Sequence, residues 1–143
     1  MSHFLTAVIV PPMPDEADIL DKVEELLAPY DQNGEWNRER SRWDWRVIGG
    51  RWDGQVTGCD PAPWSLLTPP EFILERNITL VDERHPDFVP WAIVTPDGAW
   101  HERAHMEWCI QPRAVENPAW PGRAEEIFAR YPDHLLVAVD CHV

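Results

Sequence analysis

An almost uninterrupted run of apolar and β-branched residues near the start of the chain, His3 to Val10 (HFLTAVIV), constrains the fold more than any other feature. Such a run suits a β-strand that is covered on both faces, because both faces then carry apolar side chains. A second run of this kind, His134 to Val143 (HLLVAVDCHV), closes the sequence. We therefore predict a sheet with the first strand near its centre and the last run as another of its strands.

Periodicity between these two runs predicts two helices and two further strands. Asp15 is suited to cap the first helix, because its side chain can accept a hydrogen bond from a free N–H group of the first turn. Pro96-Asp97-Gly98 predicts a turn that leads into a hairpin partner, Ala99 to His101. The expected segments are helices within 15–29 and 118–131, and strands at 43–48 and 88–95.

The resulting order, strand-helix-strand-strand-helix-strand, is typical of a ferredoxin-like βαββαβ fold. We therefore expect a single α+β domain over residues 1–143, with an antiparallel sheet and both helices on one face. The other face would be left for the tryptophans, a partner or a ligand. Glycine and proline between Asp53 and Pro70 predict a long loop inserted after the second strand. Glu71 to Val81 suits a short helix that runs into a short strand.

Charge and cysteine content narrow the classes of function. The 143 residues include 25 acidic and 12 basic side chains, a formal net charge of −13, which argues against nonspecific binding to nucleic acid. Three cysteines without CxxC spacing do not indicate a disulfide framework, and they fit a reducing cytoplasm. The first apolar run is too short for a membrane span or a signal peptide. An open sheet face or edge would allow a homo-oligomer.

The stretch from Ser41 to Gly54 (SRWDWRVIGGRWDG) holds three of the nine tryptophans and two adjacent glycines. Its first half alternates as a β-strand does. We expect Gly49 and Gly50 to end this strand, because glycine permits positive φ and lets the backbone lie close against another group. The two predicted faces are Trp43, Trp45 and Val47 on one side and Asp44, Arg46 and Ile48 on the other.

Two interpretations of this stretch stay open. In the first, the guanidinium group of Arg51 binds a carboxylate or phosphate of a ligand, and Trp45 or Trp52 stacks against it. In the second, which is structural, the tryptophans anchor the core, the glycines form a bulge, and Arg51 pairs with Asp44 or Asp53.

A second candidate site is the segment HERAH, which satisfies the HExxH pattern of zinc proteases. On a continuous helix His101, His105 and Cys109 would share one face and could bind zinc, with Glu102 as the general base. However, a turn comes just before the segment and Pro112 just after it. Such enzymes need a long helix, so the metalloprotease interpretation is disfavoured.

A third candidate is the end of the last strand. Asp140 and His142 would share one face of this strand, while Cys141 would point to the other. From neighbouring strands His3 or His101 could meet them, and two or three imidazoles with a carboxylate would suit a metal site or acid–base chemistry. The structural alternative is a charged strand end that reaches solvent, with Cys141 as an ordinary core residue.

Three motifs together, WDWRVIGGRWDG, TPDGAWHE and VAVDCH, resemble a family of small uncharacterised proteins carried by bacteriophages and prophages. The resemblance spans most of the chain from Trp43 to His142, and it implies a setting in the cytoplasm of a bacterial host. The positions that match the family pattern are Trp43, Trp45, Gly49, Gly50, Arg51, Trp52, Gly98, Trp100, His101, Asp140, Cys141 and His142.

Three functions follow as hypotheses. The first is a phage accessory protein that binds a small anionic or nucleotide-like ligand and could sequester a host defence signal. The second is a small hydrolase that depends on a divalent metal, and the third is an acidic protein that binds and inhibits a host enzyme. The first would use Arg51 with Trp45, Trp52 and Trp100 beside Gly49 and Gly50; the second would use His101, Asp140 and His142 as metal ligands and catalytic groups, with Glu102 as the base.

Overall fold

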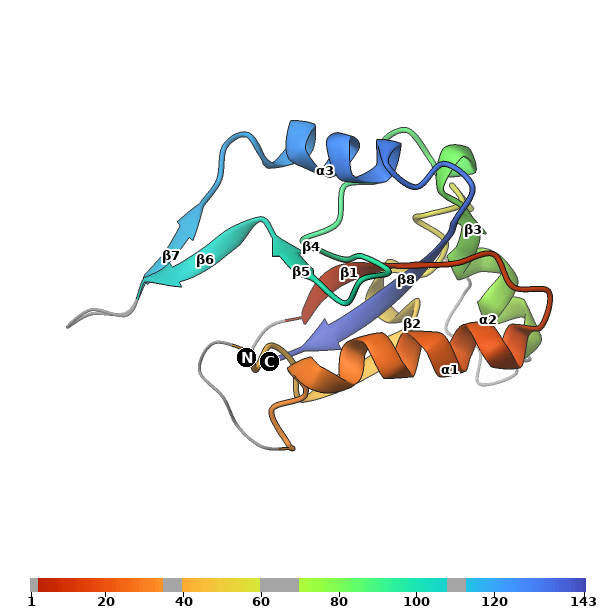
Figure 1. Ribbon diagram of the computed structural model, residues 1–143, viewed down its shortest axis with the longest axis horizontal. Coiled ribbons are helices and arrows are strands. Elements are labelled where there is room, and N and C mark those ends of the chain that lie inside the picture. The colour runs from red at the N-terminus through yellow and green to blue at the C-terminus, as the bar shows by residue number, and fades with distance from the viewer. Residues whose placement is uncertain (1–2, 35–39, 60–69, 108–112) are drawn as a thin grey trace.

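The computed structural model describes residues 3–34, 40–59, 70–107 and 113–143 (Figure 1). Within these ranges the chain forms eight strands and three α-helices. The strands are β1 (His3–Val10), β2 (Trp45–Ile48), β3 (Ile78–Leu80), β4 (Ala92–Val94), β5 (Trp100–Glu102), β6 (Ala104–Glu107), β7 (Arg113–Glu116) and β8 (Leu135–His142). The helices are α1 (Glu16–Leu27), α2 (Pro70–Asn77) and α3 (Trp120–Ala129).

Six of the described strands form one mixed sheet in the order β2-β8-β1-β4-β5, with β3 paired to β8 beyond the end of β2. β1 is antiparallel to β8 along its whole length and parallel to β4. The predicted interior position of the first strand is therefore confirmed. The long pairing with β8 also brings His3 opposite His142, where β1 begins and β8 ends.

Alternate residues of the central strands point to opposite faces of the sheet, and a different helix covers each face (Figure 1). On one face Ala7 of β1 belongs to a core cluster with Phe128 of α3. On the other face Val8 of β1 belongs to a cluster with Leu27 of α1. The sheet is thus sandwiched between α3 and α1.

The predicted ferredoxin-like βαββαβ arrangement is wrong. The sheet has six strands and mixed direction, the described chain has three helices, and α1 and α3 lie on opposite faces. The physical reason lies in the central strands, which are apolar on both faces and need cover on both. In addition, the tryptophan-rich strand β2 pairs with β8 at one side of the sheet and not with the strand from 88–95.

The segment after the predicted strand at 88–95 also differs from expectation. Only Ala92–Val94 is strand, because Pro90 has no N–H group for a sheet hydrogen bond. The predicted hairpin is present as β4 and β5 around the turn at Gly98, where φ is 85°. Beyond it the chain forms the unpredicted ribbon β6-β7, which extends away from the sheet (Figure 1).

Several predictions about single elements are confirmed, although the predicted topology is wrong. Asp15 caps α1 as predicted, since its Oδ1 atom accepts a hydrogen bond of 2.9 Å from the N–H group of Ala17. Residues 70–80 form the expected short helix and short strand. Of the loop predicted at 53–70, residues 60–69 lie outside the described part. No helix in the described ranges is both long and apolar enough to cross a lipid bilayer.

Candidate functional site

The tryptophan-rich stretch bends at Asp44, so its predicted alternation fails at its start. Trp43 lies before β2 and is buried on the α1 face, where its Nε1 atom donates a hydrogen bond of 3.0 Å to the carbonyl of Leu27. Trp45 begins β2 and is 50% exposed. β2 pairs with the end of β8, so Trp45 is the direct neighbour of His142 across the two strands. Both side chains lie on the α3 face of the sheet, whereas Trp43 lies on the α1 face.

Two histidine–aspartate pairs meet beside Trp45. Nδ1 of His3 lies 2.8 Å from Oδ1 of Asp140, and Nδ1 of His142 lies 2.7 Å from Oδ1 of Asp44. The two imidazole rings are 5.0 Å apart between centroids, with a T-shaped geometry. The sheet register produces this arrangement, since His3 and His142 are directly opposite on β1 and β8.

The two carboxylates determine how the imidazoles are presented. A carboxylate is a hydrogen-bond acceptor, so Nδ1 of each ring donates to it and Nε2 is left for other partners. Nε2 is the nitrogen on the far side of the ring from the carboxylate. Asp140 and Asp44 therefore orient His3 and His142 in the way that acid–base histidines are commonly oriented.

Asp140 is the most buried member of this group, with a side chain only 2% exposed. Its second oxygen, Oδ2, accepts a hydrogen bond of 3.0 Å from the backbone N–H group of Arg51. This bond requires the chain to pass close to the carboxylate at Gly50, where φ is 54° and any Cβ atom would collide with Asp140. The close approach predicted for the glycine pair is therefore confirmed, and it serves to hold Asp140.

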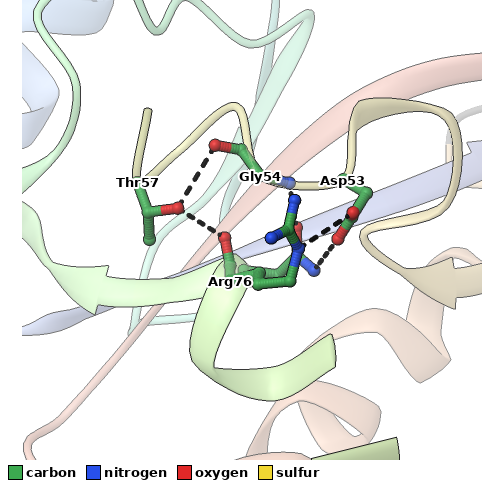
Figure 2. A network of polar contacts seen from close by, with 5 residues as sticks. Asp53, Gly54, Thr57 and Arg76 are labelled. Atoms are coloured by element: carbon green, nitrogen blue, oxygen red, sulfur yellow. Dashed lines mark hydrogen bonds and ion pairs between the residues drawn. The ribbon is translucent and has the colours of Figure 1, made fainter. Parts of the chain in front are cut away.

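The segment that follows the glycines is braced by a polar network (Figure 2). Arg76 donates from Nε to Oδ2 of Asp53 at 3.0 Å, and Asn77 donates from Nδ2 to Oδ1 of Asp53 at 2.8 Å. The single O–H group of Thr57 is shared between the backbone carbonyls of Gly54 and Arg76, which lie 3.2 and 2.8 Å from Oγ1. The network joins residues 53–57 to the end of α2, and β2 pairs with β8 just before the glycines, so the turn that contacts Asp140 is held from both ends.

An open hollow of about 500 Å³ lies at the paired histidines. Asn33 reaches it from the loop after α1 and donates from Nδ2 to the carbonyl of Asp44 at 2.6 Å. Trp45 approaches His3 edge to face, with centroids 5.9 Å apart. The described residues that line the hollow are His3, Asn33, Asp44, Trp45 and His142.

Most of the predicted ligand-binding residues do not line this hollow. The backbone N–H group of Arg51 donates to Asp140, whereas its side chain is exposed. The structural alternative expected this side chain to pair with Asp44 or Asp53, and it pairs with neither. Trp52 packs against the core on the α3 face, and Trp100 packs against the core on the α1 face. Of the predicted stacking residues, Trp45 alone is placed for a ligand in the hollow.

The candidate enzyme residues are also divided between places. His142 and Asp140 lie together at the end of β8, whereas His101 is on β5, which β4 separates from β1. Nε2 of His101 is 3.4 Å from Oγ1 of Thr95, and burial lowers the pKa of His101 below its ordinary value. Glu102 accepts a hydrogen bond of 3.1 Å from Nε1 of Trp100. Of the two histidines expected to meet Asp140, His3 does so and His101 does not.

The HExxH segment is not helical. Its first two residues end β5 and the last lies in β6, so the spacing of four does not place the histidines on one helix face. Cys109 lies outside the described residues. Over the part of the chain that the structure describes, no three or more histidine, cysteine, aspartate or glutamate side chains are grouped so as to hold a metal ion.

Cys141 is the core residue that strand alternation predicts. It points to the α1 face, away from Asp140 and His142, and it is fully buried. Burial raises its pKa to about 12. Because the thiolate is the reactive form of cysteine, Cys141 is unsuited to act as a nucleophile near neutral pH.

Sequence reasoning missed Asn33 and assigned Asp44 only as a partner of Arg51. The signal for Asp44 was present, since it lies between two tryptophans of the most specific motif. Comparisons with protein-family models, with curated proteins and with solved structures give no match. The resemblance to phage proteins therefore stays a prediction.

Proposed function

We propose that the hollow at His3, Trp45 and His142 binds a small ligand that carries an aromatic ring and a single negative charge, as a cyclic nucleotide does. The observation that carries this proposal is the pair of imidazoles, each oriented by a carboxylate, beside a half-exposed tryptophan. Ligand sites commonly combine an apolar wall with a few convergent polar groups.

The aromatic ring follows from Trp45. A large side chain that is 50% exposed beside a hollow offers a stacking surface, and nucleobases stack on such surfaces whatever their sequence. His3 also packs against Trp45 in a T-shaped geometry, so the position of the Trp45 ring does not depend on a ligand. A planar ligand would lie against Trp45 with its polar end toward the imidazoles.

The single charge follows from the balance of the site. Two protonated imidazoles would be offset by Asp44 and Asp140, and the described residues that line the hollow include neither lysine nor arginine. The whole chain carries a formal charge of −13. A nucleoside triphosphate would therefore be repelled, whereas a phosphodiester with one negative charge could accept hydrogen bonds from the two Nε2 atoms. Such a site would suit sequestration of a signalling nucleotide by a phage accessory protein.

Calorimetric titration tests this proposal. Ribonucleoside 2′,3′-cyclic monophosphates of adenine, guanine, cytosine and uracil are titrated separately, with ATP as the highly charged comparison. We expect at least one cyclic nucleotide to bind more tightly than ATP. Trp45→Ala should weaken this binding roughly 5-fold to 150-fold, because stacking on an aromatic side chain contributes about 1–3 kcal/mol per base.

The matched control is Leu80→Ala, which truncates another exposed side chain at the opposite end of the β8 pairing. This variant should bind as the unmodified protein does. Tighter binding of ATP, equal binding by the Trp45→Ala variant, or no binding of any cyclic nucleotide would each overturn the proposal. The last outcome would direct attention to the acidic surface and a basic protein partner.

A further inference from the structure

We infer that the same hollow cleaves ribose phosphodiesters without a metal ion, with His3 and His142 as the general base and the general acid. This inference rests on the proposed function, because it needs the phosphodiester to bind there. It goes further in assigning a reaction to the site. It starts from two imidazoles that line one hollow, each hydrogen-bonded through Nδ1 to a carboxylate, with their centroids 5.0 Å apart.

The separation of the rings suits a shared phosphate. Their centroids are 5.0 Å apart and both rings line the hollow. The proposed reaction requires each Nε2 atom to lie about 2.8 Å, the length of a hydrogen bond, from an oxygen of one tetrahedral group. Each carboxylate accepts a hydrogen bond from Nδ1 and so fixes the tautomer of the neutral imidazole, with Nε2 on the side of the ring away from it. Either ring can therefore accept a proton at Nε2 or donate one from it.

The proposed reaction takes its nucleophile from the substrate. The described residues that line the hollow include no serine, threonine, cysteine or lysine, and Cys141 is buried on the other face. A ribose phosphodiester supplies its own nucleophile, because the 2′-hydroxyl group lies next to the phosphorus atom. Such a substrate needs only one proton removed and one proton delivered, and two imidazoles provide both.

The proposed cleavage exchanges one oxygen–phosphorus bond of the substrate for another. One imidazole takes the proton of the 2′-hydroxyl group, and the oxygen forms a bond to phosphorus. The bond from phosphorus to the 5′-oxygen of the next nucleoside breaks, its electron pair passes to that oxygen, and the other imidazole supplies the proton. The products are a 2′,3′-cyclic phosphate and a nucleoside with a free 5′-hydroxyl group. No water, oxidant or metal ion is consumed, and proton exchange with solvent restores the two imidazoles.

Charge selects the size of the substrate. A formal net charge of −13 opposes a long polyanion, whereas a dinucleoside monophosphate carries one negative charge. Its first base could stack on Trp45, which lies directly across the strand pair from His142. We therefore assign short ribonucleotide phosphodiesters, and not RNA polymers, as the substrate class.

The test incubates the full chain with a mixture of ribodinucleoside monophosphates in excess EDTA and separates the products by chromatography. We expect 2′,3′-cyclic nucleotides and free nucleosides to accumulate, and the corresponding deoxyribonucleotides to stay intact. His3→Gln and His142→Gln should each lower the rate by about 10²-fold to 10⁴-fold. His101→Gln is the control, because His101 lies on β5, away from the hollow, and its rate should be unchanged.

Measuring cyclic-nucleotide binding for every variant distinguishes failure of this inference from failure of the proposed function. If the unmodified protein binds cyclic nucleotides but does not cleave the dinucleotides, the inference is overturned while the proposed function stands. Cleavage that EDTA abolishes, or that persists in both histidine variants, also overturns it. Loss of rate in a histidine variant supports the inference only if that variant keeps its fold, as shown by an unchanged circular dichroism spectrum and melting temperature. If either glutamine variant unfolds, the Asn variant at the same position is used, and wild-type-like turnover by that variant also overturns the inference.

Discussion

Replacing Gly50 with alanine is expected to destabilise the fold by about 3 kcal/mol or more. Gly50 has a φ of 54°, a conformation that alanine adopts only with strain. Its added Cβ atom would also collide with the buried carboxylate of Asp140, which has to shift. That shift would disturb both the bond to His3 and the bond from the N–H group of Arg51. Urea denaturation followed by circular dichroism measures the loss.

Gly98→Ala is the matched control for the backbone strain. Gly98 has a φ of 85°, but a Cβ atom built there meets nothing within 4 Å. This substitution should therefore cost about 1–2 kcal/mol, the strain of the left-handed conformation alone. Equal losses for the two variants would show that an added Cβ atom meets no obstacle at Asp140 and would contradict the close approach of Gly50 to this carboxylate.

Phe128→Ala should destabilise the protein by about 3–5 kcal/mol, and Leu27→Ala by about 2–5 kcal/mol. Both side chains are fully buried, Phe128 from α3 on one face of the sheet and Leu27 from α1 on the other. Because the sheet separates them, the double variant should lose the sum of the two values to within about 0.5 kcal/mol. The measurement is again urea denaturation. The control is the exposed Val89→Ala, which checks sample handling and the dependence of the unfolding free energy on urea concentration.

A coupling energy well above that margin would contradict the two-faced sandwich. Two helices on one face of the sheet, as the ferredoxin-like prediction required, would share core contacts, and their truncations would then interact. Comparing the double variant with the two single variants therefore distinguishes helices on opposite faces of the sheet, as observed, from helices on one face, as predicted.

Local sequence signals predicted individual elements because their causes are local. Asp15 caps α1 through a neighbouring N–H group, and Gly98 turns the hairpin through its own φ angle. The order of strands depends on contacts between distant segments, which alternation does not specify. The pairing of Trp45 with His142 joins residues that are far apart in the sequence, so it could not be found from either segment alone.

The candidate site was predictable in part for the same reason. Strand alternation placed Asp140 and His142 on one face, and His3 was one of two histidines expected to join them. The pairing of Asp44 with His142 was not predictable, because it depends on the bend that interrupts the alternation before β2. Arg51 attracted attention through the chemistry of its side chain, whereas the structure uses its backbone N–H group.

The most direct test of the site is long-range ¹H–¹⁵N NMR of the histidine rings at alkaline pH, where imidazoles are neutral. His85 is an internal reference, because its Nδ1 atom accepts a hydrogen bond of 3.1 Å from the N–H group of Asp87 and its proton must be on Nε2. We expect His3 and His142 to show the opposite tautomer, with the proton on Nδ1 facing Asp140 and Asp44 and Nε2 free for a ligand. The Nε2-protonated pattern at both rings would contradict the two oriented pairs and, with them, the proposed site.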